Sequence, residues 1–260
     1  MKSYSTVVIS AGYAGIGYGL CNDNVLILEK GEMPGSDFHS VIRPSDKLTA
    51  PKNDKGKEFL AFLAKNDVIK EGFADILEMS LALCKYIDLQ PKRPEILLDA
   101  QLIEVSKKDD GFEVEYRANT GVHTVKAKHV IDTSFLCDSA RENANIEKKL
   151  LHIYLSNMPD GYKESISKAY NDVMFYDNFY ENEAVVSFGF SPKTTIFEAR
   201  EAIEKSFEKA FNNEYPVIDM ISFEFDVIAT VLKKENITWL PPHSFPDPIA
   251  AFDAGCSLEV

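Results

Sequence analysis

The segment 6-TVVISAGYAGIGYGL-20 decides the fold of this chain. Its apolar run, residues 6–9, is typical of a strand that is buried on both faces in a parallel sheet. A glycine-containing turn follows, and a second apolar run, 25-VLIL-28, ends at Glu29. Strand, turn, short helix, strand and carboxylate in this order predict a nucleotide-binding unit at the start of the chain.

The turn between these two strands supplies the expected phosphate contacts. Gly12 would let the backbone approach a pyrophosphate, and Gly15 would let the helix pack closely against the strand. The helix N-terminus would offer unpaired N–H groups to phosphate oxygens, and Glu29 would accept hydrogen bonds from ribose hydroxyls. Ser10 stands where the fingerprint has its first glycine, which predicts a reshaped phosphate loop. A strand, turn and helix without any ligand is the alternative.

Length and charge limit the possible partners. The chain has 260 residues and a net charge of −13. This length predicts one large domain or two interleaved ones, and the negative charge opposes binding to nucleic acid or to an anionic membrane surface. No run of about eighteen apolar residues occurs, and no leader-like segment precedes the first strand. We therefore expect a soluble, cytoplasmic protein.

Cysteine spacing predicts neither a metal site nor a disulfide framework. The four cysteines are widely separated, with no CxxC pair and no ligand spacing to the five histidines; they are Cys21, Cys84, Cys137 and Cys256. They are expected to be reduced thiols, and Cys84 and Cys21 are expected to fill space as small apolar side chains. Because Cys21 has no cysteine near it in the sequence, disulfide exchange is not expected.

The middle of the chain changes from helical to strand periodicity. Residues 58–67 and 72–85 predict helices. Short strands are then predicted at 95–98 and 100–105, and with 112–116 and 123–127 they predict a three-stranded meander. The meander leads into a strand that ends at Thr133 and Ser134. That strand would bring both hydroxyl residues back to the turn at Gly12.

The second half of the chain alternates strands and helices. Strands are predicted at 151–155, 173–176 and 184–190, helices at 161–172 and 195–212, and a β-rich run at 221–232. We expect an α/β fold made of a Rossmann-like domain with a parallel sheet and a β-meander, and a smaller, interleaved α+β substrate domain. The expected divisions are 1–150 and 151–235, with a C-terminal return to the first domain at 236–260.

The C-terminal segment predicts one more helix. Pro248 stands at a helix start behind a capping residue, Asp247, and Gly255 stands where the helix would end. A proline-rich loop that precedes such a helix would present its N-terminal N–H groups to a negative or electron-rich ligand.

With these segments in order, the chain resembles the FAD-dependent oxidoreductases of the glutathione-reductase-like superfamily, the flavoproteins with two dinucleotide-binding domains. Three blocks carry the resemblance. The first is VVISAGYAGIGYGL with VLILEKGEMPGSDF, the second is ILLDAQLIEVSKKDDGFEVEYRANTGVHTVKAKHVIDTS, and the third is SFPDPIAAFDAG. The first is similar to the dinucleotide turn and ribose-binding acid, the second to the adenine strand and meander, and the third to the helix that faces the flavin ring.

The resemblance implies FAD as the cofactor and assigns a role to each matching residue. The pyrophosphate, the adenosine and the ribityl chain would contact the first two blocks, and the flavin ring would lie near the last. The implied cofactor-binding residues are Ser10, Gly12, Tyr13, Ala14, Gly15, Glu29, Lys30, Gly35, Ser36, Leu102, Thr133, Ser134, Pro248 and Ile249. Ser10 and Ser134 replace glycines of the family pattern, and the chain is short for the family.

The implied activity is the transfer of a hydride or two electrons between FAD and a small organic substrate. Three residues are candidates for roles in catalysis: His243 as a general acid or base, Arg43 as a carboxylate ligand, and Cys137 as a redox or covalent group. Two alternatives stay open. The chain could be a catalytically degenerate binding or scaffolding subunit, as a homo-oligomer or with a partner chain, or NAD could occupy the first site.

Overall fold

The computed structural model describes residues 1–43, 47–177, 182–211 and 216–260. Its first sheet has a parallel centre in the order β15-β8-β1-β2-β5, and β14 pairs antiparallel with β15 at one edge. The strands are β1 (Ser3–Ile9), β2 (Val25–Leu28), β5 (Glu95–Leu97), β8 (Gly121–Asp132), β14 (Leu232–Lys234) and β15 (Ile237–Trp239). β1 therefore has β2 on one side and β8 on the other, which makes its carboxyl end a topological switch point.

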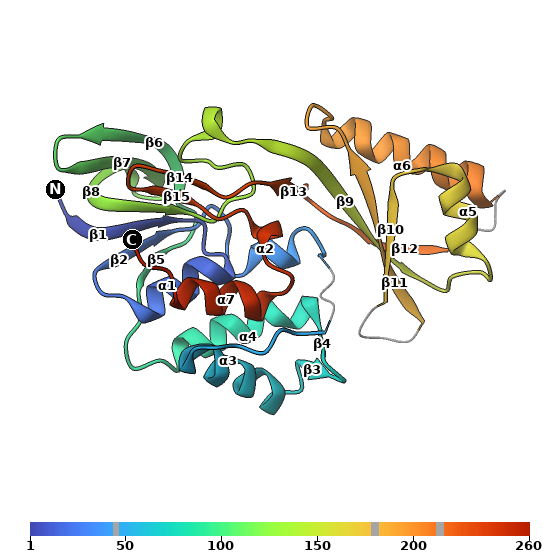
Figure 1. The fold of residues 1–260 in the computed structure, drawn as a ribbon, viewed down its shortest axis with the longest axis horizontal. Helices are drawn as coiled ribbons and strands as arrows, with labels where there is room; N and C mark the ends of the chain where they lie inside the picture. Colours follow the sequence, from blue (N-terminus) through green and yellow to red (C-terminus); the bar gives the residue numbers. More distant parts are fainter. Residues whose placement is uncertain (44–46, 178–181, 212–215) are drawn as a thin grey trace.

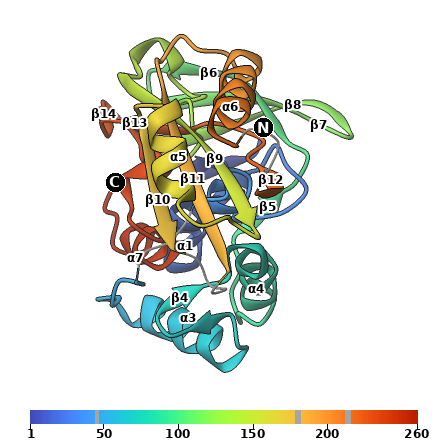
Figure 2. The same cartoon turned by 90° about the vertical axis from the view of Figure 1, so that its right-hand side faces the viewer.

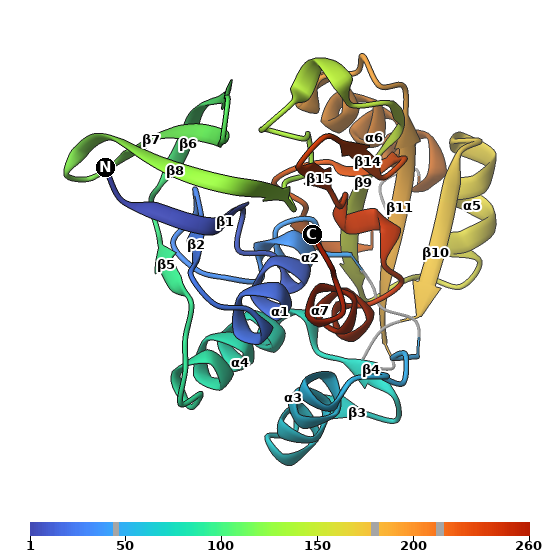
Figure 3. The same cartoon turned by 60° about the vertical axis from the view of Figure 1, so that its left-hand side comes forward.

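The first sheet is covered on both faces, as Figures 1 and 3 show. On one face lie the helices α1 (Tyr13–Cys21), α3 (Asp54–Lys65), α4 (Ile76–Asp88) and α7 (Pro248–Cys256). On the other lies the meander of β6 (Gln101–Lys108), β7 (Gly111–Ala118) and β8. Val8 and Ile27 pack toward the helices, whereas Val7 and Leu26 pack toward the meander. This double burial is the reason that the strands are apolar at consecutive positions.

A second, antiparallel sheet lies beside the first domain. It contains β9 (Ile146–Ser156), β10 (Val173–Asp177), β11 (Glu183–Phe190), β12 (Val217–Ile221) and β13 (Asp226–Ala229). Two helices, α5 (Tyr162–Ala169) and α6 (Ile196–Phe211), cover its outer face, which points toward the viewer in Figure 2. Leu151 and Ile153 pack under these helices. His152 lies between them in the strand and so points to the opposite face.

The predicted fold class is confirmed: a Rossmann-like core with a parallel sheet and a meander is joined to an antiparallel sheet with helices. The division of the chain at 150 and 235 stays a prediction. The sheet membership of the chain changes at β9, which begins at Ile146, and again at β14, which begins at Leu232. No helix in the described ranges is both long and apolar enough to cross a membrane.

Several element boundaries differ from the sequence prediction. The helix expected over 72–85 begins at Ile76, because Gly72 has a φ of +90° in a short hairpin of β3 (Ile69–Lys70) and β4 (Phe73–Ala74). The meander strand and the strand at 128–134 form one continuous strand, β8. The β-rich run at 221–232 is divided among β12, β13 and β14. Gly255 lies inside α7, whose C-cap is Ser257.

The close contact between α1 and α7 explains two of the glycines. A Cβ atom added at Gly17 would overlap the carbonyl oxygen of Phe252, and one added at Gly255 would overlap that of Ala14. The two helices therefore pack backbone against backbone. Glycines in these helices serve helix packing, a role that sequence spacing cannot distinguish from ligand binding.

Candidate functional site

A cavity of about 580 Å³ opens at the carboxyl ends of β1, β2 and β8. This is the switch point of the parallel sheet, where open α/β folds place their ligands. The start of β6 and the loop after β8 form two walls, and β9 with the loop between β12 and β13 forms a third. The lining residues are Ile9, Ser10, Leu28, Lys30, Ser36, Ala100, Gln101, Leu102, Ile103, Ser134, Phe135, Leu136, Asp138, Arg141, Lys149, Ile196, Phe223, Glu224 and Phe225.

Five of the predicted cofactor residues line this cavity together, namely Ser10, Lys30, Ser36, Leu102 and Ser134. They come from five separate places in the sequence. The cavity volume lies within the range of about 300–1,000 Å³ that is usual for small-molecule sites. The other predicted residues, from Gly12 to Gly15 and at Gly35, Thr133, Pro248 and Ile249, are buried.

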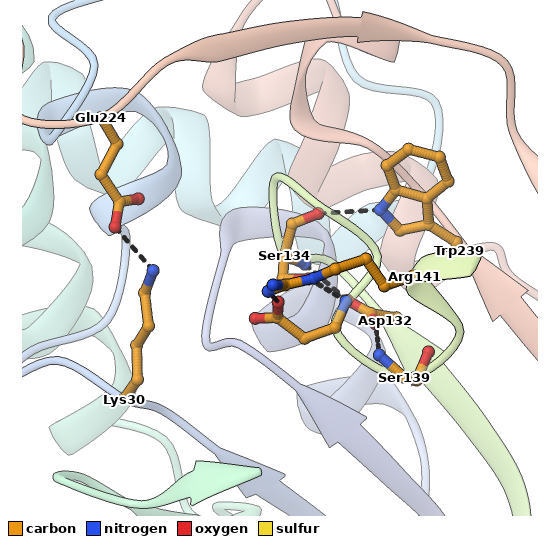
Figure 4. Close-up of polar contacts among 8 residues, drawn as sticks. Lys30, Asp132, Ser134, Ser139, Arg141, Glu224 and Trp239 are labelled. Carbon is orange, nitrogen blue, oxygen red and sulfur yellow. Dashed lines mark hydrogen bonds and ion pairs between the residues drawn. The ribbon is translucent and has the colours of Figure 1, made fainter. Parts of the chain in front are cut away.

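The cavity wall carries cations that are partly neutralised. Lys30 Nζ lies 2.6 Å from Glu224 Oε1, an ion pair that connects the end of β2 to the second sheet (Figure 4). Arg141 pairs with Asp138 at 2.6 Å. Lys149 donates to the Thr194 carbonyl oxygen at 2.9 Å and lies over the Phe225 ring. Burial lowers the pKa of Lys149, so an anion near it would be stabilised more than at a solvent-exposed lysine.

Asp132 shapes the loop that forms the far wall. Its buried carboxylate accepts hydrogen bonds from the Ser134 N–H at 2.8 Å and the Ser139 N–H at 2.7 Å. Ser134 also donates its hydroxyl to this carboxylate, and its carbonyl accepts the Trp239 indole N–H at 2.8 Å (Figure 4). Burial raises the pKa of Asp132. The buried Asp132 carboxylate therefore holds the loop in place, and the Ser134 hydroxyl is hydrogen-bonded to it.

Glu29, the predicted ribose ligand, points back into the turn. Its Oε2 accepts the Ala11 N–H at 2.6 Å and the Ser10 hydroxyl at 3.1 Å, and its Oε1 accepts the Gly31 N–H at 2.7 Å. The side chain is 1% exposed and does not line the cavity. Ser10 has a φ of +70°, the left-handed conformation that glycine would adopt more easily. Its bond to Glu29 helps to hold this conformation.

A second carboxylate covers the N-terminus of α1. Asp37, in the short helix α2 (Ser36–His39), accepts the Tyr13 N–H at 3.1 Å. A Cβ atom added at Gly12 would lie 2.7 Å from its Oδ2. Burial raises the pKa of Asp37 to about 7, even though the positive charge of Arg43 opposes this shift. Asp37 thus lies at the α1 N-terminus, the place where other helices bind a phosphate.

A backbone hydrogen bond also connects the loop after β2 to the turn between β1 and α1. The Gly35 N–H donates to the Ala11 carbonyl oxygen at 2.9 Å, which joins the loop after β2 to the turn. With Glu29 on Ala11 and Asp37 on Tyr13, two backbone N–H groups of the turn already have carboxylate acceptors. The cavity therefore has space for a small molecule, and a diphosphate at the α1 N-terminus would have to displace Asp37 from the Tyr13 N–H.

The N-terminus of α7 is also capped by the chain itself. Asp247 accepts the Ala250 N–H at 2.8 Å through Oδ1 and the Thr49 N–H at 2.9 Å through Oδ2. This confirms the predicted N-cap. Pro248 and Ile249 are buried in α7 and do not line the cavity.

Two of the three catalytic candidates meet at a buried carboxylate, Asp226. His243 Nδ1 lies 2.8 Å from Asp226 Oδ2, and the Arg43 guanidinium lies 3.5 Å from Oδ1. His152 reaches Asp226 at 3.3 Å and pairs through its other ring nitrogen with Ser187. Burial opposes the charge on Asp226, but Arg43 and the two histidines together hold its pKa well below the usual range. Burial lowers the pKa of His152.

Arg43 has unused hydrogen-bonding capacity. It is 5% exposed and stacks on Phe38 with 3.7 Å between the guanidinium carbon and the ring centroid. Within the described ranges, none of its three side-chain nitrogens has a hydrogen-bond acceptor. Its neighbour His243 is partly exposed, with its side chain 31% accessible. The junction of the two domains therefore holds a buried cation beside an accessible imidazole.

Cys137, the third candidate, lies elsewhere. It packs in a small core with Trp239 and is fully buried. Burial raises its pKa to about 12, so the thiol is protonated at neutral pH. Among the described residues, no group of three or more His, Cys, Asp or Glu side chains could hold a metal ion.

The sequence did not predict the residues whose contacts lie far away along the chain. Asp37 follows Ser36 in a turn-rich loop, and nothing local shows that it reaches α1. Asp226 opens a short strand of the second domain, and Lys149 lies inside β9. The only available signal was a carboxylate in an otherwise apolar strand segment, because a charge at such a position is usually paired.

The same fold occurs in several solved structures of low sequence identity. The p-nitrophenol 4-monooxygenase PnpA from Pseudomonas putida is 13% identical, with a TM-score of 0.55, over 92% of this chain and 72% of PnpA. A geranylgeranyl bacteriochlorophyll reductase-like protein from Thermoplasma acidophilum is 13% identical, with a TM-score of 0.58, over 98% and 77%. A flavoprotein/dehydrogenase from Cytophaga hutchinsonii is 13% identical, with a TM-score of 0.55, over 98% and 76%.

These likenesses show the fold and nothing finer, since the identities are low. The chain spans 60% of another matching structure, AlpK. No protein-family model matches this chain, and no curated protein matches it.

Proposed function

We propose that this chain is a flavin-dependent oxidoreductase of the glutathione-reductase-like superfamily that binds FAD with its adenosine half in the cavity. The observation that carries the proposal is the convergence of Ser10, Lys30, Ser36, Leu102 and Ser134 on one cavity at the switch point of the sheet. A fold shared with a flavoprotein and a monooxygenase supports the same class of activity.

The chain's own residues would position the cofactor as follows. The start of β6 at Leu102 would lie along the adenine, and Lys30 would lie beside the ribose. Arg141 and Lys149 would offer positive charge on the opposite wall. When bound, FAD supplies the two-electron chemistry, and the protein supplies orientation and the exclusion of water.

The groups at Asp226 are the proposed substrate-facing residues. Asp226 would hold His243 in one orientation, and His243 would accept or donate a proton through its second ring nitrogen. Arg43, whose Nη1 is paired with Asp226, would offer Nε and Nη2 to a carboxylate or another small anion of an organic substrate. His152 is too deeply buried to reach a substrate and would serve to position Asp226.

A second candidate function is favoured by the closed turn. Glu29 and Asp37 occupy the N–H groups that a pyrophosphate needs. A protein that keeps these carboxylates in place would bind a ligand without a diphosphate, such as AMP, and would act as a binding or scaffolding subunit with a partner chain or as a homo-oligomer. The two candidates differ in one property, which is whether Asp37 yields to a diphosphate.

The deciding experiment measures flavin and AMP binding to the purified chain. After incubation with excess FAD and gel filtration, the oxidoreductase proposal expects a yellow protein with about one FAD per chain. A colourless protein that still binds AMP in a calorimeter would overturn it in favour of the second candidate. A protein that binds neither ligand would overturn both.

Matched substitutions locate the ligand. Leu102→Trp fills the cavity and is expected to weaken FAD or AMP binding by at least about 100-fold, because the base loses its space. Val122→Trp is the control, since Val122 lies on an exposed part of the meander away from the cavity. Equal binding by both variants would place the ligand elsewhere.

A further inference from the structure

The strongest feature outside the proposed site is the meeting of two cysteines at the ends of α1 and α7. Cys21 is the last residue of α1, and Cys256 is the last residue of α7. They belong to the first and last helices of the chain. They are far apart in the sequence, but the packing of α7 on α1 brings them near each other.

Helix geometry places both thiols in the α1–α7 interface. Cys21 follows Gly17 by one helical turn and so lies on the same face of α1. Gly17 is the point at which α7 touches α1, and the Cys256 thiol reaches its carbonyl oxygen at 3.3 Å. The two side chains lie close enough that each thiol shifts the pKa of the other. The backbones of α1 and α7 are already in contact at Gly17, so the two cysteines lie at neighbouring ends of one helix interface.

The two thiols differ in their surroundings. Cys21 is exposed to solvent, whereas Cys256 is half-buried behind it. The neighbouring Cys256 thiol and the charge of Lys55 lower the pKa of Cys21, and the Cys21 thiol raises the pKa of Cys256. An accessible thiol that ionises readily, next to a second thiol, is the arrangement found in redox-sensitive cysteine pairs.

We propose that Cys21 and Cys256 form a reversible disulfide when the protein meets a peroxide. Cys21 is the residue that reacts first, and Cys256 is the residue that resolves the intermediate. This site is independent of the proposed flavin chemistry. The proposal departs from the expectation that Cys21 takes no part in disulfide chemistry.

The reaction balances with hydrogen peroxide as the oxidant. The Cys21 thiolate attacks one peroxide oxygen, the O–O bond breaks, and the other oxygen leaves as hydroxide and takes a proton to become water. Cys21 is then a sulfenic acid. The Cys256 thiol loses its proton and attacks the Cys21 sulfur, the S–S bond forms, and the S–O bond breaks to release a second water. The two thiols lose two electrons, which the peroxide gains.

The test uses the full-length, flavin-free protein, so its result does not depend on FAD binding. The protein is treated with hydrogen peroxide, quenched with acid, alkylated and digested without reductant. We expect one cross-linked pair of peptides that contains Cys21 and Cys256, no covalent dimer, and full reversal by dithiothreitol. A wild-type protein that yields only overoxidised Cys21, a different pair of cysteines, or a covalent dimer would overturn the proposal.

Serine variants separate the two roles. Cys256→Ser should lose the cross-link and accumulate sulfenic acid at Cys21, which a dimedone probe detects. Cys21→Ser should lose both products. Cys84→Ser is the matched control, because burial raises the pKa of Cys84, and it should form the cross-link at the wild-type rate. Equal dimedone labelling of Cys21→Ser and Cys256→Ser would contradict the assignment of Cys21 as the first residue to react.

Discussion

The turn after β1 and the cavity beside it lie at the same edge of the same sheet, but their charges differ. The turn carries buried carboxylates, and the cavity wall carries cations. At the turn, Glu29 accepts the Ala11 N–H and Asp37 accepts the Tyr13 N–H, and both carboxylates are almost completely buried. The cavity has Lys149 and two paired cations on its walls and open space between them. The N–H groups of the turn thus have carboxylate acceptors from the protein itself, whereas the neighbouring cavity has space beside its cations.

This difference shows that the glycine-containing turn can be required by the fold even where no ligand contacts it. The strand, turn and helix form the centre of the sheet, and two carboxylates contact N–H groups of the kind that bind a phosphate. A glycine fingerprint can therefore persist for structural reasons alone. Four substitutions test this contrast between the turn and the cavity.

The largest expected effect is at Asp37. Its pKa is near 4 in an unfolded chain and about 7 in the folded protein, so the folded state holds more protons between these values. Its contribution to stability therefore falls as the pH rises through this interval. From pH 5 to pH 8, wild type should lose about 3 kcal/mol of unfolding free energy relative to Asp37→Asn, which does not titrate.

Urea unfolding of both proteins at several pH values measures this difference. The Asp37→Asn variant should also bind FAD or ADP about tenfold more tightly at pH 8, because the charge at the α1 N-terminus is gone. Parallel stability curves for the two proteins would contradict the burial of an ionised carboxylate at the turn. Unchanged FAD affinity would show that Asp37 does not compete with a diphosphate.

Glu29→Ala should have the next largest effect. It leaves the N–H groups of Ala11 and Gly31 without their acceptor in a buried turn. The expected loss of unfolding free energy is about 2 kcal/mol, measured by urea unfolding at pH 7. Because Glu29 does not line the cavity, AMP binding to the folded variant should stay within about twofold of wild type. A large loss of AMP binding without a loss of stability would mean that Glu29 contacts the ribose.

Lys149→Ala tests the cavity. Removing this cation should weaken AMP binding by about five- to tenfold at low salt, and less at high salt, because the screening of charge grows with ionic strength. Lys148→Ala is the control. The neighbouring Lys148 points to the other side of β9 and pairs with Asp172, so its removal should leave the AMP affinity unchanged. Equal effects of the two variants in calorimetry would contradict a ligand at the cavity wall.

The smallest effect is expected for the Lys30–Glu224 pair. Both side chains are substantially exposed, with 53% and 37% of their surface accessible. Exposed ion pairs contribute about 0–1 kcal/mol, so Lys30→Met should change the unfolding free energy by less than about 0.5 kcal/mol. A larger loss would mean that this pair holds the two domains together.

Local sequence patterns predicted most of the first domain. The apolar runs at 6–9 and 25–28, the alternation in the meander and the cap at Asp247 all depend on neighbours within a few residues. These features act at the level of single strands and caps, where residue type and position suffice. Boundaries were wrong where a turn residue such as Gly72 interrupted a helical pattern.

The candidate site was predicted only where it follows from topology. Ser10, Leu102 and Ser134 reach the cavity because parallel strands end at the same edge. Asp37, Asp226 and the Cys21–Cys256 pair depend on contacts between segments that are far apart in the sequence. No local pattern encodes which buried side chain receives a given N–H group, so these contacts required the three-dimensional structure.

The packing of α1 against α7 has a consequence for the order in which the protein folds. Gly17 and Gly255 place the second element of the chain directly on the last one, and the sheet face under α1 is incomplete until α7 arrives. On the ribosome, the second sheet and its helices are synthesised before α7. The core around α1 can therefore be completed only after the residues of α7 have been synthesised.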